Sequence, residues 1–123
     1  MRRANADIAR QCFQAFADSD RALLETIIAD DFHFSSPYDN RLNRAAYFER
    51  CWPNNEFITG FDFIRVIEAG DDVIVTYEGK SARGRTFRNT ECLSIRDGQI
   101  VEVEVYFGWS IPHEAEDGGF INP

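Results

Sequence analysis

The second half of the sequence constrains the fold most, because four of its segments have the patterning of β-strands. We predict strands over residues 60–68, 73–80, 85–96 and 99–107. The turn signals "EAGDD", "SARG" and "RDGQ" separate them. Connections this short join antiparallel neighbours, so the four strands form a meander against which the first half must pack.

The first half has the periodicity of helices. Over residues 5–17 the apolar positions recur at steps of three and four, and they are Ile8, Ala9, Cys12, Phe13 and Phe16. A second helix follows the capping residues 18–20, and its apolar stripe is Leu23, Leu24, Ile27 and Ile28. A third helix begins at the cap Asn43 and stops at Pro53, and its inner face is Ala45, Phe48, Cys51 and Trp52.

One early strand lies between these helices. The segment "DFHFSSP" alternates Phe32, Phe34 and Ser36 against His33 and Ser35, and "YDNRL" then reads as a loop. The predicted class is therefore α+β, with three N-terminal helices packed on a curved, mainly antiparallel sheet. The length of 123 residues suits a single domain over 1–123, with an irregular tail at 110–123.

The composition restricts the classes of molecule to which the chain can bind. The net charge of −8 argues against nucleic acid and acidic membrane surfaces, and no apolar run approaches the roughly 18 residues of a membrane span. The three cysteines have no metal-binding spacing, which favours buried thiols in a cytoplasmic protein. Eleven phenylalanines in so short a chain either fill a core or line an apolar cavity.

The last hairpin carries an acid on its apolar side, and the turn decides its neighbours. A two-residue turn puts Glu91 directly opposite Glu104, where two carboxylates would repel. A three-residue loop with a bulge pairs Ile95 with Gln99 and puts Glu91 opposite Val103. We predict the second register, because it separates apolar from polar side chains better.

In that register Glu91 and Asn89 are the polar residues of an apolar wall. The wall contains Phe34, Phe87, Leu93, Val103 and Val105, while Cys92, Glu102 and Glu104 face the other side. A buried carboxylate must be paired, hydrogen-bonded or protonated. Either Glu91 has a structural partner such as an arginine or a helix-end amide, or the wall lines a cavity in which Glu91 meets a ligand.

The order of elements, with "ADDFHFSSP" leading from helix to strand and "DGQIVEVEVYFG" closing the sheet, resembles the nuclear-transport-factor-2-like superfamily, and its SnoaL-like branch in particular. The resemblance covers about residues 4–109. It implies a cone-shaped α+β barrel with a deep apolar pocket, and a homodimer through the convex sheet face near Arg88, Thr90 and Tyr106. The same fold serves isomerases, polyketide cyclases, dehydratases, epoxide hydrolases and non-catalytic modules, so fold does not settle function.

Comparison with the steroid isomerase branch places Cys12 at the oxyanion tyrosine, Ser36 at the catalytic aspartate and Glu91 at the pocket acid. Without a base at Ser36, classical ketosteroid isomerase activity is rejected. The epoxide hydrolase set of two acids around an arginine is not assembled, and His33 and His113 do not form a dehydratase site.

The sequence thus predicts a domain that binds a small apolar or aromatic molecule in a deep pocket. The leading hypothesis is cofactor-free and metal-free acid–base chemistry of the isomerase, cyclase or hydrolase type, with Glu91 and Asn89 as catalytic residues. The alternative is a non-catalytic ligand-binding or interaction module. The predicted ligand-binding residues are Cys12, Phe16, Phe34, Ser36, Tyr38, Trp52, Tyr77, Val103 and Val105. For Tyr38 and Trp52 plain packing is the competing interpretation, and the inward face of the strand holding Tyr77 stays open.

Overall fold

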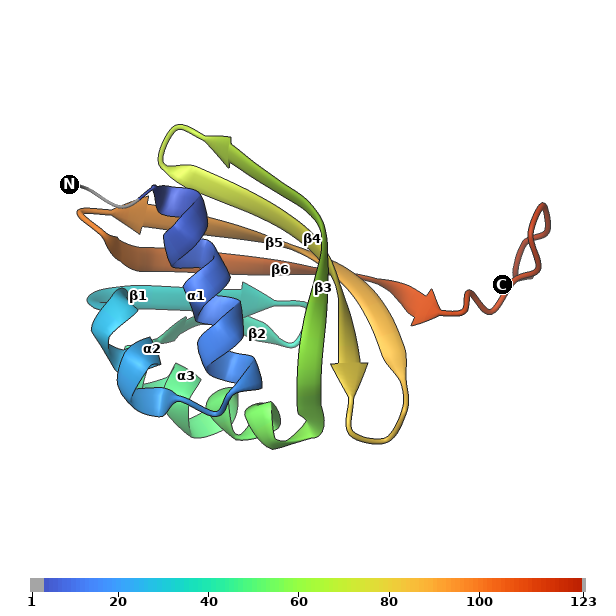
Figure 1. The fold of residues 1–123 in the computed structure, drawn as a ribbon, viewed down its shortest axis with the longest axis horizontal. Helices are drawn as coiled ribbons and strands as arrows, with labels where there is room; N and C mark the ends of the chain where they lie inside the picture. Colours follow the sequence, from blue (N-terminus) through green and yellow to red (C-terminus); the bar gives the residue numbers. More distant parts are fainter. Residues whose placement is uncertain (1–3, 123) are drawn as a thin grey trace.

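A computed structural model describes residues 4–122, which form helices packed on one curved sheet (Figure 1). The elements, in chain order, are α1 (Asn5–Ala17), α2 (Arg21–Ile27), β1 (Ile28–Ser36), β2 (Asp39–Asn43), α3 (Arg44–Arg50), η1 (Trp52–Phe57), β3 (Ile58–Ala69), β4 (Asp72–Ser81), β5 (Thr86–Arg96) and β6 (Gln99–Ile111). The predicted class and its three helices are confirmed. No helix within residues 4–122 is long and apolar enough to cross a bilayer.

The helices begin where the sequence offers caps. The side chain of Asp20 accepts a hydrogen bond from the backbone N–H of Leu23 at the start of α2, and Asn43 accepts one from Ala46 at the start of α3. The helix predicted over residues 5–17 matches α1 at both ends. These caps fix the residues at which α2 and α3 begin.

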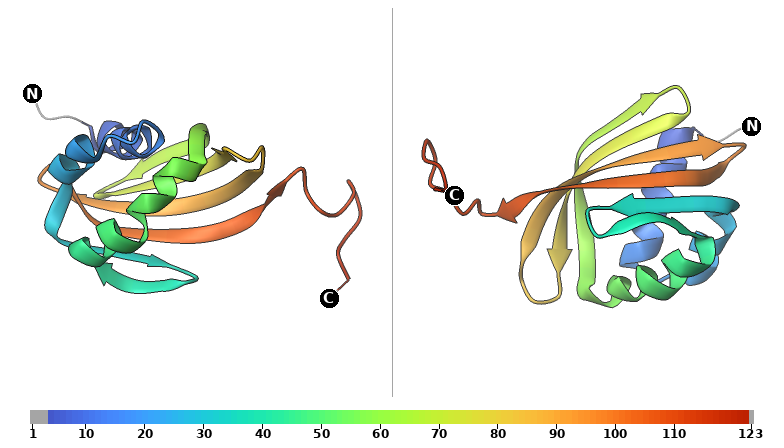
Figure 2. Two further views of the ribbon diagram at one scale, coloured as in Figure 1. Left: turned by 90° about the horizontal axis from the view of Figure 1, so that it is seen from below. Right: turned by 180° about the vertical axis from the view of Figure 1, so that it is seen from behind.

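The sheet has the strand order β2-β1-β6-β5-β4-β3, which leaves β2 and β3 as its two edges. The four-stranded meander β3–β6 is confirmed, and β1 joins it in parallel beside β6. The strands curve around the helices, and α1 crosses the inner face of the sheet (Figures 1 and 2). The sheet does not close on itself, so the cone has a space between α1, α3 and the inner strand faces.

The hairpin of β5 and β6 has the predicted faces but a different turn. Asp97 and Gly98 form a two-residue turn with positive φ angles of 52° and 79°, as a type I′ turn requires. Ile95 therefore pairs with Ile100, and a bulge on β6 then shifts the register so that Glu91 pairs with Val105 instead of Val103. The predicted three-residue loop is wrong. The extra residue lies inside β6 and not in the turn, and from there it separates apolar from polar side chains as well as the predicted loop would.

Three further predictions near the helices are corrected. The segment "YDNRL" is not a loop, because residues 39–43 form the edge strand β2 against β1. Ile28 begins β1 and does not extend α2. In α3 the buried residues are Tyr47 and Phe48, whereas Ala45 is exposed, and Trp52 lies in the following 3-10 turn with Pro53.

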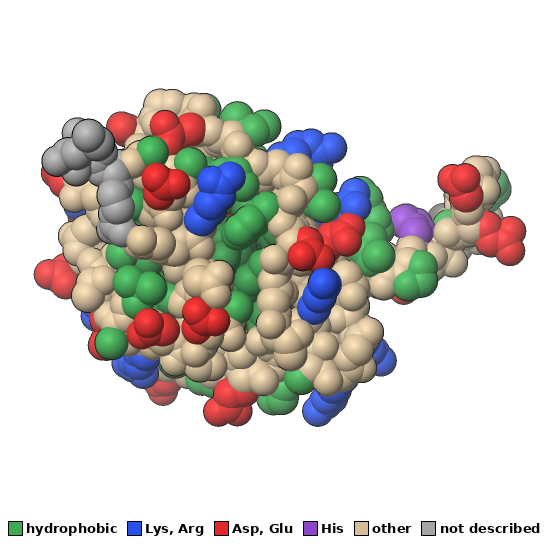
Figure 3. All heavy atoms as spheres, in the orientation of Figure 1, with side chains coloured by type: hydrophobic (Ala, Val, Ile, Leu, Met, Phe, Trp, Pro, Cys, Tyr) green, Lys and Arg blue, Asp and Glu red, His purple; other side chains and the backbone are tan. Residues whose placement is uncertain are grey.

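The chain leaves the body of the molecule at the end of β6. Strand β6 continues to Ile111, so the predicted irregular tail begins two residues later than expected. Residues 112–122 then project away from the sheet, and acidic side chains gather on this segment (Figures 1 and 3).

Candidate functional site

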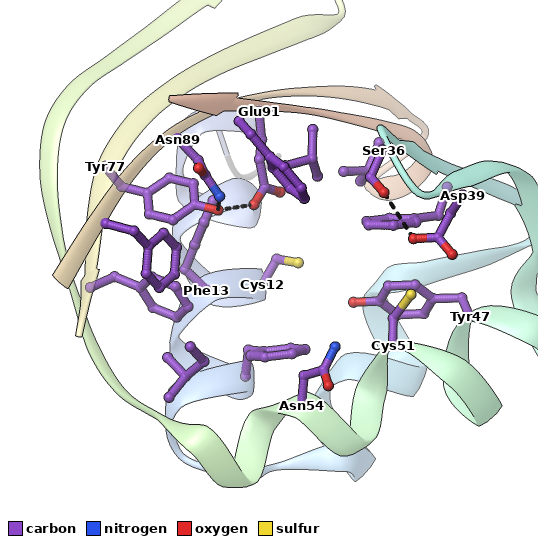
Figure 4. A pocket seen from close by; sticks show the side chains of 18 of the residues that line it. Cys12, Phe13, Ser36, Asp39, Tyr47, Cys51, Asn54, Tyr77, Asn89 and Glu91 are labelled. Atoms are coloured by element: carbon purple, nitrogen blue, oxygen red, sulfur yellow. Dashed lines mark hydrogen bonds between the residues drawn. The ribbon is translucent and has the colours of Figure 1, made fainter. Parts of the chain in front are cut away.

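A cavity of about 260 Å³ lies between α1, α3 and the inner face of the sheet. Its walls are mainly aromatic rings, with polar groups at two places that face each other across the space (Figure 4). The exposed rings of Tyr38 and Phe107, whose centroids are 5.4 Å apart, lie where the cavity meets solvent. The volume is slightly below the roughly 300 Å³ at which typical ligand pockets begin, so it suits a small molecule.

Glu91 is held at one side of the cavity by a chain of hydrogen bonds. The hydroxyl of Tyr77 donates to Oε2 of Glu91 at 2.5 Å, and the side-chain amide of Asn89 donates to the Tyr77 hydroxyl at 3.3 Å. The carbonyl oxygen of Asn89 in turn accepts from the backbone N–H of Gly108 at 3.3 Å. Each donor in this chain is directed toward the carboxyl group, which fixes its position.

The second carboxyl oxygen of Glu91 faces the cavity. Among residues 4–122 it has no hydrogen-bond partner, and no fully buried side-chain oxygen or nitrogen lacks one. Oε1 is therefore reachable from the cavity. Of the two explanations that the sequence left open, a structural arginine or helix-end amide does not apply within the described residues, because the partner is a tyrosine hydroxyl.

Burial raises the pKa of Glu91 to about 7, and the hydrogen bond from Tyr77 opposes this rise. In the apolar cavity the charged form loses hydration, and the single phenol donor replaces only part of it. Glu91 consequently exchanges its proton near neutral pH, which is where a general acid or base is most effective.

The thiols of the cavity are not activated. Burial and the nearby Glu91 raise the pKa of Cys12, and burial together with Asp39 raises the pKa of Cys51 to about 11. A thiol that stays protonated is a poor nucleophile. Tyr47 also lines the cavity, and its pKa is raised by burial and by the neighbouring thiols and Glu91. These groups can serve as neutral hydrogen-bonding or packing groups.

A second carboxylate stands across the cavity from Glu91. Asp39, at the start of β2, accepts a hydrogen bond from the hydroxyl of Ser36 at 2.8 Å and forms an ion pair with Nε of Arg50 at 2.6 Å. Figure 4 shows the Ser36–Asp39 pair on the wall opposite Tyr77 and Glu91. The position that the family comparison assigned to a catalytic aspartate thus has a serine bonded to an aspartate three residues later.

Of the eleven predicted site residues, ten line this cavity and Trp52 does not. Trp52 is buried beside it, with its ring 5.5 Å from Phe16 in an edge-to-face contact. The catalytic and binding roles of the ten remain predictions. The cavity is also lined by residues that were not predicted as site residues, namely Phe13, Asp39, Tyr47, Cys51, Asn54, Ile58, Phe61, Phe87 and Phe107. No pattern in residues 39–43 could have identified Asp39, because this short segment has neither a long alternation nor a strong apolar face.

Comparison with known families identifies the chain. The model of the SnoaL-like domain matches residues 9–103, which is most of the sequence. The chain belongs to the SnoaL-like family. The predicted family is thereby confirmed. No protein with a curated description matches the sequence.

Several solved structures share the fold of this chain at low sequence identity. A proposed ketosteroid isomerase from Kribbella flavida has a TM-score of 0.74 and 16% identity, over 97% of this chain and 82% of its own. IdmH from Streptomyces antibioticus, a proposed polyketide cyclase, has a TM-score of 0.70 and 20% identity over 84% and 91%. An LEH-like epoxide hydrolase from M. tuberculosis has a TM-score of 0.69 and 18% identity over 85% and 82%. These likenesses establish the fold of the chain. Its chemistry has to be inferred from the residues that line the cavity.

Proposed function

We propose that this SnoaL-like protein binds a small, largely apolar molecule in the cavity and exchanges a proton with it through Glu91. The observation that carries the proposal is the Glu91 carboxyl group, which has a pKa of about 7 and one oxygen turned to an aromatic cavity. A carboxyl group without a ligand to act on would be a net cost in such surroundings.

The neighbouring groups suit proton transfer. Tyr77 and Asn89 hold the carboxyl group in place, and the aromatic walls exclude water and present a planar molecule to Oε1. Asp39 on the opposite wall supplies a second carboxylate that can accept a hydrogen bond from the far end of the same molecule. The proposed reaction class is cofactor-free isomerisation, cyclisation or hydrolysis, as the known members of the fold suggest.

The first test uses a generic substrate for a carboxylate base. 5-Nitrobenzisoxazole is a small planar molecule whose C3 proton is taken by a base while its N–O bond breaks, which leaves a coloured cyanophenolate. We expect the protein to accelerate this reaction by about 10²-fold or more over buffer. The rate should rise with pH through about 7, because Glu91 must be ionised to act as the base.

The control and the alternative function are built into the same assay. Glu91→Gln should reduce the rate to that of buffer, whereas Glu104→Gln, which removes the same charge from the outer face of the hairpin, should leave the rate unchanged. Nuclear magnetic resonance would show whether the probe contacts the cavity residues. Binding without acceleration would support the non-catalytic ligand-binding module, and absence of binding would count against both.

A further inference from the structure

The hydroxyl of Tyr47 is a buried polar group without a partner in its own chain. Tyr47 is 6% exposed, and its hydroxyl forms no hydrogen bond with any residue from 4 to 122. Figure 4 shows that the ring points from α3 into the cavity and carries this hydroxyl at its end. No fully buried side-chain oxygen of the described chain lacks a hydrogen bond, so the Tyr47 oxygen touches the open space of the cavity. A buried phenol without a partner is a net cost that a ligand would remove.

Aromatic neighbours hold the ring of Tyr47 in this position. Its centroid lies 5.1 Å from that of Phe32, 5.2 Å from that of Phe34 and 5.5 Å from that of Phe48. Phe32 and Phe48 are themselves buried in the core. The ring is therefore fixed before any ligand arrives, and a ligand that uses the hydroxyl does not have to order it.

The Tyr47 hydroxyl is a neutral donor that no other group in the described chain uses. Burial is the main cause that raises the pKa of Tyr47, so the phenol keeps its proton. Two other hydroxyls of the cavity are occupied, because Tyr77 donates to Glu91 and Ser36 donates to Asp39. Above a pH of about 7 the carboxyl group of Glu91 is ionised and can only accept.

We propose that Tyr47 selects the ligand by donating a hydrogen bond to one of its oxygen atoms, and that the ligand is a neutral aromatic or alicyclic carbonyl compound. This inference rests on the proposed function, since it concerns the same cavity. A carbonyl oxygen only accepts, so it matches the phenol. A carboxylate also accepts, but Glu91 and Asp39 in the same lining repel it. A hydrocarbon of the same shape leaves the phenol unpaired, and a site that forms a hydrogen bond discriminates against such an analogue.

Two probes of nearly equal shape isolate this hydrogen bond. 2-Acetylnaphthalene has a ketone oxygen where 2-isopropenylnaphthalene has a CH₂ group. Equilibrium dialysis at pH 8 gives both dissociation constants, and their ratio is compared between proteins, because this comparison cancels the different hydration of the probes. We expect the preference for the ketone to fall about fivefold to tenfold in Tyr47→Phe. Tyr106→Phe, which removes a hydroxyl bonded to Glu104 at an exposed position, should keep the wild-type preference.

The infrared spectrum of the bound ketone reports the hydrogen bond itself. A donor to the carbonyl oxygen weakens the C=O bond, so the stretching frequency of bound 2-acetylnaphthalene should be lower in the wild type than in Tyr47→Phe. A purely structural role of Tyr47 would leave this frequency unchanged. The urea midpoint of Tyr47→Phe should be no lower than that of the wild type, because the hydroxyl has no partner in the described chain.

Three results would each overturn the assignment of Tyr47. An unchanged preference in Tyr47→Phe would give the donor role to another lining group, such as the side-chain amide of Asn54. An unchanged carbonyl frequency would show that the phenol does not reach the ligand, and a lower urea midpoint would show that the hydroxyl stabilises the fold. These results leave the proposed function intact. A wild type that binds neither probe would overturn this inference and count against the proposed function as well.

Discussion

At the scale of the single residue, Glu91 links the fold to function through its proton. The pKa in the folded chain is about 7, whereas an unfolded glutamate has a pKa near ~4.3. Between these two values the folded state holds the proton and the unfolded state has released it. This contribution to stability is therefore fully present below pH ~4.3 and is lost as the pH rises through about 7.

The Glu91→Gln variant should show this loss directly. Glutamine keeps an oxygen that can accept from the Tyr77 hydroxyl, and it has no charge to desolvate. We expect the variant to gain stability relative to the wild type as the pH rises from 5 to 8, by about 2–3 kcal/mol in total. Urea unfolding at several pH values measures this. A variant that is less stable at pH 8 than the wild type would show that Glu91 has a favourable partner.

Replacement of Tyr77 by phenylalanine should raise the pKa of Glu91, whereas a general loosening of the site would lower that pKa. The Tyr77 hydrogen bond lowers the pKa of Glu91, so its removal should raise that pKa by about 1 or more. The ring would keep its edge-to-face contact with Phe13, at 4.8 Å. Carboxyl ¹³C resonances followed against pH give the midpoint. A midpoint below that of the wild type would contradict the assigned hydrogen bond.

At the scale of the element, the sequence predicted what depends on alternation and capping. The helix of residues 5–17, the cap at Asn43 and the meander all follow from local periodicity, and they are present. The faces of the last hairpin were predictable, because a shift of the register by two residues keeps every side chain on its side. The position of the bulge was not, since a two-residue turn with a bulge in β6 sorts the faces as well as the predicted loop.

The second carboxylate of the cavity illustrates what local patterns miss. Asp39 lies in a short edge strand whose partner is β1, and residues 39–43 have neither a long alternation nor a strong apolar face. Its place opposite Glu91 depends on the tertiary packing of α3, which supplies Arg50. Tyr47 was also not predicted. A rotation of α3 about its axis by one residue decides whether Ala45 or Tyr47 faces inward, and the local sequence does not fix that rotation.

The strand β4 allows a test of how tightly the cavity wall is packed. A Cβ atom at Gly79 would overlap the ring of Phe87, which lines the cavity, whereas a Cβ atom at Gly60 on β3 would meet nothing within 4 Å. We expect Gly79→Ala to cost about 1–3 kcal/mol, because Phe87 must move, and Gly60→Ala to change stability by less than about 0.5 kcal/mol. Urea unfolding of both variants makes the comparison. Equal effects would mean that the Phe87 ring is free to shift.

At the scale of the whole molecule, charge restricts what the cavity can bind. The lining residues include two carboxylic acids and, within the described chain, no lysine, arginine or histidine. The chain as a whole carries a net charge of −8. An anion that enters the cavity loses its hydration, and Arg50, the cation beside the lining residue Asp39, is already engaged in an ion pair with that carboxylate. The aromatic walls, by contrast, accept neutral and cationic molecules.

Three probes with the same naphthalene ring test this selection. They are 2-naphthylmethanol, 2-naphthylmethylamine and 2-naphthoate, which at pH 8 are neutral, cationic and anionic. Calorimetry at pH 8 should find 2-naphthoate at least about tenfold weaker than the alcohol, because a repulsion of 1.4 kcal/mol already produces that ratio. The amine should bind no more weakly than the alcohol.

The pH dependence of the anion follows from the same proton on Glu91. Below about 7 the carboxyl group is neutral, so 2-naphthoate should bind more tightly at pH 6 than at pH 8, while the affinity of 2-naphthylmethanol stays nearly constant. In Glu91→Gln the charge is absent at both pH values, and the affinity for 2-naphthoate should lose most of its dependence on pH. An anion that binds at pH 8 as tightly as the alcohol would require a cation in the cavity. That result would contradict both the charge assigned to its walls and the ionisation of Glu91 near neutrality.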